Sequence, residues 1–313
     1  MAGRIYKMHI KRLLFVYNPR SGRGVINTYL LDILRVFDAA GYTTTIYRMK
    51  YSGDGAWMAE HESENYDLLV CAGGDGTLNG VISGLMKVEP EKRPGVGFIP
   101  TGSTNDNRKN YKLPANILHA AKVAVNGNPF ATDIGQFNDK FFTYVASFGE
   151  LSAVSCFTPQ ASKNLLGHAA YIPEGLKVLL KMPSQKIRVV YDAGAEEGDY
   201  FLGMVTNATS VGGFQGITGA NIDLQDGLFE VMLFKKPKDL LEFQKEVGAV
   251  LTPSDTGDGL ITRLKSSRIT FECEEEMQWV VDGEDAGKCT FAEIENINKA
   301  VRIMSGLVSR NKK

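Results

Sequence analysis

Glycines surround a single carboxylate in the stretch CAGGDGTLN at residues 71–79. The apolar run at 67–71 predicts a buried strand, and the apolar residues spaced three and four apart after Leu78 predict a helix. A glycine-rich turn between a strand and a helix leaves bare backbone beside a positive helix N-terminus, which suits a phosphate group. Asp75 would repel that phosphate unless it holds a metal ion or accepts a hydrogen bond, so the stretch indicates a nucleotide–Mg²⁺ site. A plain tight turn with Asp75 as a helix cap would explain the same residues.

Two further turns have a similar composition. The turn NPRSGRG at 18–24 lies between the apolar run at 13–17 and a helical pattern that starts at Ile26, and PTGSTND at 100–106 follows the run at 96–99. Strands alternating with helices predict right-handed βαβ units and a parallel sheet. Because ligands of such sheets bind at the carboxyl ends of the strands, these turns predict a phosphate site at one edge. The arginines of the first turn would equally suit plain solvated surface.

The sequence changes character near residue 130. Strand-like runs recur from there to about residue 294, separated by turn signals such as Asn-Asp and Asp-Gly, and helical patterns interrupt them at 168–181 and 238–250. This pattern predicts an antiparallel β-sandwich. We therefore expect a fold of class α/β plus β: an N-terminal open, mainly parallel α/β domain at 1–129, rejoined by 297–313, and a C-terminal β domain at 130–296.

Composition limits the functional classes. The chain has 313 residues, and its net charge of −1 argues against a general nucleic-acid-binding protein. The four cysteines share no CxxC spacing, which argues against a zinc site or a disulfide framework. The chain has no apolar stretch of about 18 residues and no signal-peptide pattern, so we expect a cytoplasmic protein whose membrane contact is peripheral and transient.

Four motifs occur in a characteristic order: NPxSG at 18–22, GGDGTLN at 73–79, GSTND at 102–106 and VDGE at 281–284. With them, nearly the whole chain resembles the diacylglycerol kinase catalytic-domain family, and within it the small soluble bacterial lipid kinases. GGDGT alone also occurs in NAD kinases, so the combination carries the resemblance. It implies an α/β nucleotide-binding domain, a β-sandwich lipid-substrate domain and an active site in the cleft between the domains.

The resemblance implies that the three turns bind ATP. Asp75 would act through Mg²⁺, directly or through water, because this hard cation prefers oxygen ligands. The implied nucleotide-binding residues are Asn18, Ser21, Arg23, Gly73, Gly74, Asp75, Gly76, Thr77, Asn79, Gly102, Ser103, Asn105 and Asp106.

The late motif supplies the implied catalytic carboxylates. A kinase that acts on an alcohol needs a base to accept the hydroxyl proton, and the resemblance assigns this role to Glu284, with Asp282 close to the metal or the nucleophile. On an extended segment, the spacing of two would place both carboxylates on one face. An ordinary Asp-Gly hairpin turn is the alternative reading of the same residues.

A structural Mg²⁺ site is implied near residue 226. Its ligands would be the Asp226 side chain and the backbone carbonyls of Asp223 and Leu228. Two departures from the family pattern concern the nucleotide site: Lys109 stands where many members have arginine, and Met49 stands where some relatives have threonine.

We expect an ATP- and Mg²⁺-dependent lipid kinase that transfers the γ-phosphoryl group to diacylglycerol and forms phosphatidic acid. The alternatives are an NAD kinase-like enzyme and a catalytically weak nucleotide- or lipid-sensing homologue, for which the departures at Met49 and Lys109 are the support. The identity of the lipid alcohol has no motif of its own, and a homodimer stays open.

Overall fold

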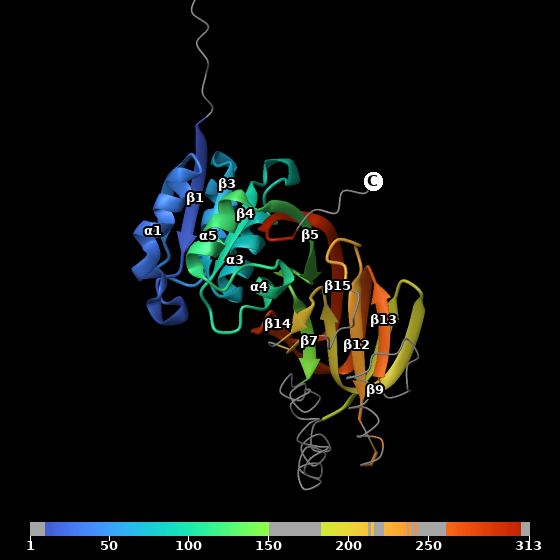
Figure 1. The fold of residues 1–313 in the computed structure, drawn as a ribbon. Helices are drawn as coiled ribbons and strands as arrows, with labels where there is room; N and C mark the ends of the chain where they lie inside the picture. The colour runs from blue at the N-terminus through green and yellow to red at the C-terminus, as the bar shows by residue number, and fades with distance from the viewer. Residues whose placement is uncertain are drawn as a thin grey trace, which may run out of the picture. The chain divides into compact units, whose positions relative to one another are not determined.

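The computed structural model describes residues 10–149, 183–211, 214–215, 222–236, 238–239, 242 and 261–307 (Figure 1). The expected helices at 168–181 and 238–250 lie wholly or mostly outside these residues. The chain divides into two compact units, one of residues 1–131 with 301–313 and the other of residues 132–300.

The sheet of the first unit is parallel, in the order β2–β1–β3–β4. The end of β15 adds to it, where Ile303 pairs in parallel with Val96 of β4. All six residues of β3 are buried, which is the pattern of a central strand covered on both faces. The strands are β1 Lys11–Tyr17, β2 Tyr42–Arg48, β3 Leu68–Gly73, β4 Gly95–Pro100 and β15 Glu284–Ser305.

Helices cover both faces of this sheet (Figure 1). Phe15 and its strand neighbours two residues away pack with α1 and α5, whereas Leu14 and Val16 point to the opposite face and are equally buried. On that face, α2 contacts α3, and α3 contacts β3. The helices are α1 Ile26–Ala39, α2 Asp54–Glu62, α3 Asp75–Leu85, α4 Asp106–Asn110 and α5 Ile117–Asn126, with 3₁₀ turns at Ser21–Gly24, Ser63–Asn65 and Pro90–Lys92.

The second unit is rich in antiparallel strands. Its core surrounds Trp279, whose ring contacts those of Phe137, Phe148 and Phe271. The arrangement as a sandwich stays a prediction. Its strands are β5 Asn128–Phe137, β6 Lys140–Phe142, β7 Val145–Gly149, β8 Gln185–Tyr191, β9 Gly194–Thr206, β10 Ser210–Val211, β11 Phe214–Gln215, β12 Phe229–Lys235, β13 Ile261–Ser266, β14 Arg268–Val281 and most of β15.

Several elements differ from the sequence expectations. The run expected at 140–148 forms two strands, because residues 143 and 144 lie between β6 and β7 and bind the side chain of Asp282. Helix α4 and strand β13 were not expected. None of the helices in the described part of the chain has the length and apolar character needed to span a bilayer.

Candidate functional site

The three glycine-containing turns meet at the carboxyl edge of the parallel sheet. A Cβ atom placed on Gly22 would lie 2.0 Å from the carbonyl oxygen of Thr101, and one placed on Gly102 would lie 2.6 Å from the Cα of Gly74. Side chains at Gly22 and Gly102 would therefore separate the turns. The glycines allow the three backbones to approach one another, as expected for turns at one edge.

Backbone hydrogen bonds hold the same turns in register. The amide of Asn18 donates to Ala72 at 2.9 Å, and the amide of Thr101 donates to Gly73 at 2.7 Å. The Asn18 side chain also accepts a bond from the amide of Arg20 at 3.0 Å. The first turn is thus shaped by Asn18 and anchored to the second, which in turn anchors the third.

Asp75 links the second turn to the third. Its carboxylate accepts hydrogen bonds from the amides of Asp106 and Asn107 at 3.0 and 3.1 Å, and from Asn107 Nδ2 at 3.3 Å. These amides begin α4, so Asp75 caps that helix and not its own helix α3, whose N-cap residue is Gly74. Burial raises the pKa of Asp75, and the hydrogen bonds from Asn107 and Asp106 oppose the rise.

The other nucleotide-binding candidates differ in exposure. Thr77 is buried against Gly73, where an added Cβ would lie 2.3 Å from the Thr77 hydroxyl oxygen. Asn79 accepts a bond from Ser83 Oγ at 2.8 Å, and Asn105 exchanges two bonds with the backbone of Gly102. The members with exposed positions are Arg23, Gly76 and Ser103, and those with intermediate burial include Asn18 and Ser21.

The two departures from the family pattern have defined surroundings. The ammonium of Lys109 lies 4.0 Å from the buried carboxylate of Asp106, so a cation is kept beside the third turn. The amide of Met49 donates to Tyr17 at 3.0 Å, and its side chain lies against Gly55 of α2. Met49 therefore packs the segment after β2 against helix α2.

Asp282 and Gly283 form a hairpin turn between β14 and β15. Their φ angles are 49° and 83°, and Val281 pairs with Glu284 across the turn. The expectation that Asp282 and Glu284 share one face of an extended segment is therefore wrong. Asp282 is buried, whereas Glu284 is exposed at the first position of β15.

The Asp282 carboxylate is fully engaged. One oxygen accepts bonds from the amide and hydroxyl of Thr143, both at 2.7 Å, and the other accepts from the amides of Tyr144 and Val145, both at 3.0 Å. Four bonds fill the acceptor sites of a carboxylate, which argues against direct contact with a metal or nucleophile. Burial raises the pKa of Asp282 to about 6, and the bonds from Thr143 and Val145 oppose the rise.

The turn implied as a structural metal site is charged. Oδ1 of Asp226 accepts a bond from the amide of Leu228, and its Oδ2 lies 3.6 Å from the ammonium of Lys265. The same ammonium lies 2.9 Å from the buried carboxylate of Glu230, whose pKa burial raises to about 7. The Asp223 side chain accepts from the amide of Gln225. The residues that the structure describes include no cluster of three or more His, Cys, Asp or Glu side chains placed to hold a metal.

The sequence analysis did not identify Asp133 as a buried carboxylate that connects two segments of the second unit. This buried carboxylate accepts bonds from the amide of Gly227, the amide of Lys299 and the side chain of Asn298, at 2.7, 2.7 and 2.9 Å. It thereby joins the turn that contains Asp226 to the segment at 298–299. An acidic residue inside the apolar strand run of β5 was the available signal, because a buried carboxylate needs donors.

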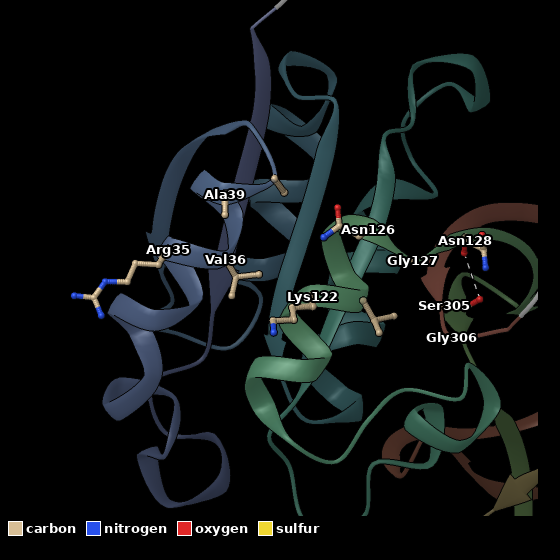
Figure 2. Close-up of a pocket in the computed structure, with 11 residues that line it drawn as sticks. Arg35, Val36, Ala39, Lys122, Asn126, Gly127, Asn128, Ser305 and Gly306 are labelled. Carbon is tan, nitrogen blue, oxygen red and sulfur yellow. Dashed lines mark hydrogen bonds between the residues drawn. The ribbon is translucent and has the colours of Figure 1, made fainter.

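A hollow of about 590 Å³ lies between the C-terminal ends of α1 and α5 (Figure 2). These helix ends lie at the amino edge of the sheet, away from the three turns. Val36 and Val123 are among the residues that line it, but the Arg35 side chain points away from Lys122 and pairs with Asp32 at 2.8 Å. The hollow therefore does not bring the two cations Arg35 and Lys122 together.

Comparisons with known proteins identify the family to which the chain is similar. The family profile "Diacylglycerol kinase catalytic domain" matches residues 12–137. The chain is 34% identical over 280 residues to a diacylglycerol kinase of Bacillus subtilis (strain 168), covering 89% of this chain and 91% of the relative. It is 33% identical over 300 residues to a diacylglycerol kinase of Staphylococcus epidermidis (strain ATCC 12228 / FDA PCI 1200), covering 94% and 92%. A crystal structure of a diacylglycerol kinase from Bacillus anthracis str. Sterne shares the fold, with a TM-score of 0.75, 24% identity and coverage of 96% and 98%.

Proposed function

The chain belongs to the diacylglycerol kinase family, and from this premise we propose that it phosphorylates diacylglycerol at the edge formed by its three glycine-containing turns. As a member of that family, it is an ATP-dependent lipid kinase. In the proposed reaction, the lipid hydroxyl oxygen bonds to the γ-phosphorus of ATP, the bond to the β-phosphate oxygen breaks, and ADP leaves. The products are phosphatidic acid and ADP. The close contact of the turns, reached only because Gly22 and Gly102 lack side chains, is the structural observation that carries the proposal.

The three turns are suited to a polyphosphate. Backbone amides at the start of α3 and the polar residues of the neighbouring turns would donate to phosphate oxygens. Asp75 and Asn107 hold the second and third turns together before ATP arrives, so less ordering is needed during transfer. The cationic side chains of Arg23 and Lys109 would offset phosphate charge.

We propose Mg²⁺ at two positions, one at Asp75 and one at Asp226. Asp75 accepts three hydrogen bonds, which leaves it suited to a bond from a water on the ion. At the turn that contains Asp226, the carboxylates of Asp226 and the buried Glu230 face one cation, Lys265, so negative charge exceeds positive charge. That excess supports a structural ion on Asp226 with the carbonyls of Asp223 and Leu228. Bound at the phosphates, Mg²⁺ would neutralise charge that develops during transfer.

Glu284 is the proposed base. Its exposed carboxylate follows a hairpin turn that Asp282 fixes through four hydrogen bonds, so Asp282 acts as a positioning residue. The lipid hydroxyl proton would pass to Glu284 as the oxygen–phosphorus bond forms. The convergence of Glu284 and the three turns on one ternary complex stays a prediction, as does the assignment of the second unit as the lipid-substrate domain.

The Glu284→Gln variant tests this proposal. We expect at least a hundredfold loss of turnover in a labelled-ATP assay across lipid alcohols in micelles, because general-base catalysis contributes roughly 10²–10⁴-fold. Glu295→Gln, which neutralises another exposed carboxylate of β15, is the matched control. If Glu284→Gln phosphorylates lipid at a rate within about tenfold of the wild type, Glu284 is not the general base. If the protein phosphorylates NAD and none of the lipid alcohols, the proposal that its substrate is a lipid is wrong.

We also propose a cytoplasmic protein that meets its lipid at the membrane surface. The substrate of a diacylglycerol kinase resides in a bilayer, and the described helices offer no span. In this proposal, the kinase approaches the bilayer with an exposed surface.

A further inference from the structure

Two half-buried thiols lie on neighbouring strands of the second unit. Cys273 belongs to β14 and Cys289 to β15, and both are free cysteines of intermediate exposure. The chain separates them by 16 positions, a spacing that gives no sequence signal for a metal site or a disulfide. Neither thiol has a part in the proposed phosphoryl transfer, so the pair is separate from the site described above.

The two thiols face the same core. Phe271 pairs with Ala292 across the strands, and both are buried in the core of the second unit. Cys273 lies two residues beyond Phe271 and therefore points to the same face of the sheet. Cys289 pairs with Met277, and it packs against this core as Cys273 does. A bond between the two sulfurs would thus join the strands on one face.

Contacts place the Cys273 sulfur against the backbone of Cys289. The Cys273 thiol lies 3.9 Å from the carbonyl oxygen of Cys289 and 3.5 Å from that of Thr290. Burial raises the pKa of both thiols, and the neighbouring Cys289 thiol raises the pKa of Cys273 further. Adjacent strands lie about 5 Å apart, and disulfides join Cα atoms about 4.4–6.8 Å apart, so neighbouring positions on two strands are within reach of this bond.

An irregular stretch of the sheet gives the pair freedom to close. The pairing of β14 with β15 shifts beyond Glu272, and residues 273–276 stand opposite Thr290 alone. Such a bulge interrupts the hydrogen-bond ladder, so the backbone there is less constrained than in a regular pair of strands. The three glutamates after Cys273 and the two residues after Cys289 are exposed, which lets a small oxidant reach the thiols from solvent.

We propose that Cys273 and Cys289 form a reversible disulfide that ties β14 to β15. The oxidant is a small-molecule disulfide, the class to which oxidised glutathione belongs. One protein thiolate attacks this oxidant, which forms a mixed disulfide and releases one small thiol, and the other protein thiolate then displaces the second small thiol. Two electrons pass from the protein sulfurs to the oxidant, and the two protons leave with the released thiols. In reducing compartments, disulfides of this kind are usually transient and sense the redox state.

The ring closed by this bond contains the hairpin turn between β14 and β15. Asp282 and Gly283 form that turn, and Glu284, the proposed base, follows it. A disulfide removes conformations from the opened states of the loop that it closes, so the hairpin would open less often. The bond and its effect on the hairpin do not depend on which reaction the protein catalyses.

Trypsin separates the two cysteines, so mass spectrometry can identify the bond. Cleavage after Arg268, Lys288 and Lys299 yields the peptides 269–288 and 289–299, which contain one cysteine each. After the intact protein is incubated with oxidised glutathione and its remaining thiols are blocked, we expect these two peptides to be joined and a reductant to separate them. A non-reducing gel should show the oxidised protein at the size of one chain. Thiols that stay free, thiols that keep glutathione, or a bond found only between two protein molecules would overturn the proposal.

Single serine variants test whether the two thiols act as a pair. Cys273→Ser and Cys289→Ser each leave one thiol, so each should keep a glutathione adduct that the wild type resolves into the disulfide. Cys156→Ser, the matched control, keeps both thiols and should form the bond like the wild type. Loss of the bond in Cys156→Ser would overturn the assignment, as would its formation in either of the other variants. The peptide measurement on the wild type decides the proposal even where a serine variant does not fold.

Hydrogen exchange measures the effect of the bond on the hairpin. The amides of residues 277–281 and 284–289 should exchange at least about tenfold more slowly in the oxidised wild type than in the reduced protein. The same oxidant should leave their exchange in Cys273→Ser unchanged, and strands β1 and β3 of the first unit provide the internal reference. Equal exchange of these amides in the oxidised and reduced wild type, with the disulfide present, would overturn the restraint on the hairpin.

Discussion

At the scale of single residues, Asp75 acts through the backbone of another turn. Its carboxylate receives the first amides of α4, so it couples the second and third turns. We expect Asp75→Asn to lower the free energy of unfolding by about 1–3 kcal/mol, because the amide group places a donor against donors. ATP affinity should fall as well, since α4 would be less ordered. Chemical denaturation and calorimetric titration with a non-hydrolysable ATP analogue measure both effects.

The exposed pair of Asp32 and Arg35 provides the control for that change. Asp32→Asn should alter stability by no more than about 0.5 kcal/mol, since exposed ion pairs contribute little. Wild-type stability of Asp75→Asn together with lost turnover would show that Asp75 serves the reaction and not the helix cap.

Asp282 gives a pH dependence whose sign follows from its burial. Its folded pKa of about 6 lies above the ordinary value of 3.8, so the neutral carboxyl favours the folded state. That contribution is present below about pH 4 and is lost as the pH rises to about 6. We expect the unfolding free energy of the wild type, relative to Asp282→Asn, to fall by up to about 3 kcal/mol across this window and then stay level. Urea denaturation at a series of pH values measures it, and a difference that rises with pH would contradict it.

Residue types in the motifs were readable from the sequence, but their surroundings were not. GGDGT and VDGE identified Asp75 and Asp282 as unusual carboxylates. The donors that bind them lie roughly 30 and 140 positions away along the chain, and no local pattern predicts such partners. The Asp-Gly pair did predict a hairpin turn, because both of its φ angles must be positive.

At the scale of elements, the packing of α2 on α3 depends on a glycine. A Cβ placed on Gly84 would lie 2.1 Å from the carbonyl oxygen of Ala56, whereas one on Gly80 would meet its nearest atom at 4.0 Å. We expect Gly84→Ala to destabilise the protein by about 1–3 kcal/mol by forcing the helices apart. Gly80→Ala should be neutral or stabilising by up to about 1 kcal/mol, because alanine favours a helix. Thermal unfolding compares them, and equal effects would show that α2 is not held closely against α3.

The periodicity of the sequence predicted the elements of the first unit better than those of the second. Helices α1 and α5 and strands β1 and β3 have clear apolar patterns. Strand β13 alternates little, because intermediate and exposed residues follow Ile261, and α4 is short and polar. Helix α4 depends on its cap from Asp75, a tertiary contact that a local pattern does not contain.

At the scale of the whole molecule, the first unit is completed by the end of the chain. Val301 and Ile303 are buried in it, and Ile303 pairs with Val96 although some 200 positions separate them. The Arg302 guanidinium also donates to the carbonyl oxygen of Arg93 at 3.0 Å. The core of the first unit therefore includes residues that follow the second unit in the chain, so we expect changes at Ile303 to weaken the first unit.

Ile303→Ala should accordingly weaken the two units unequally. Truncating a fully buried isoleucine costs about 2–5 kcal/mol, and the cavity would lie beside β4. We expect hydrogen exchange to quicken in β3 and β4 and to stay nearly unchanged in β9 and β12, with ATP affinity lost as the first unit opens. Lys288→Ala changes an exposed residue in the part of β15 that belongs to the second unit. It should alter the opening free energy measured by hydrogen exchange in either unit by no more than about 0.5 kcal/mol. Uniform faster exchange in both units would show that they unfold as one cooperative body, and residues 301–313 would then stabilise the whole molecule and not the first unit alone.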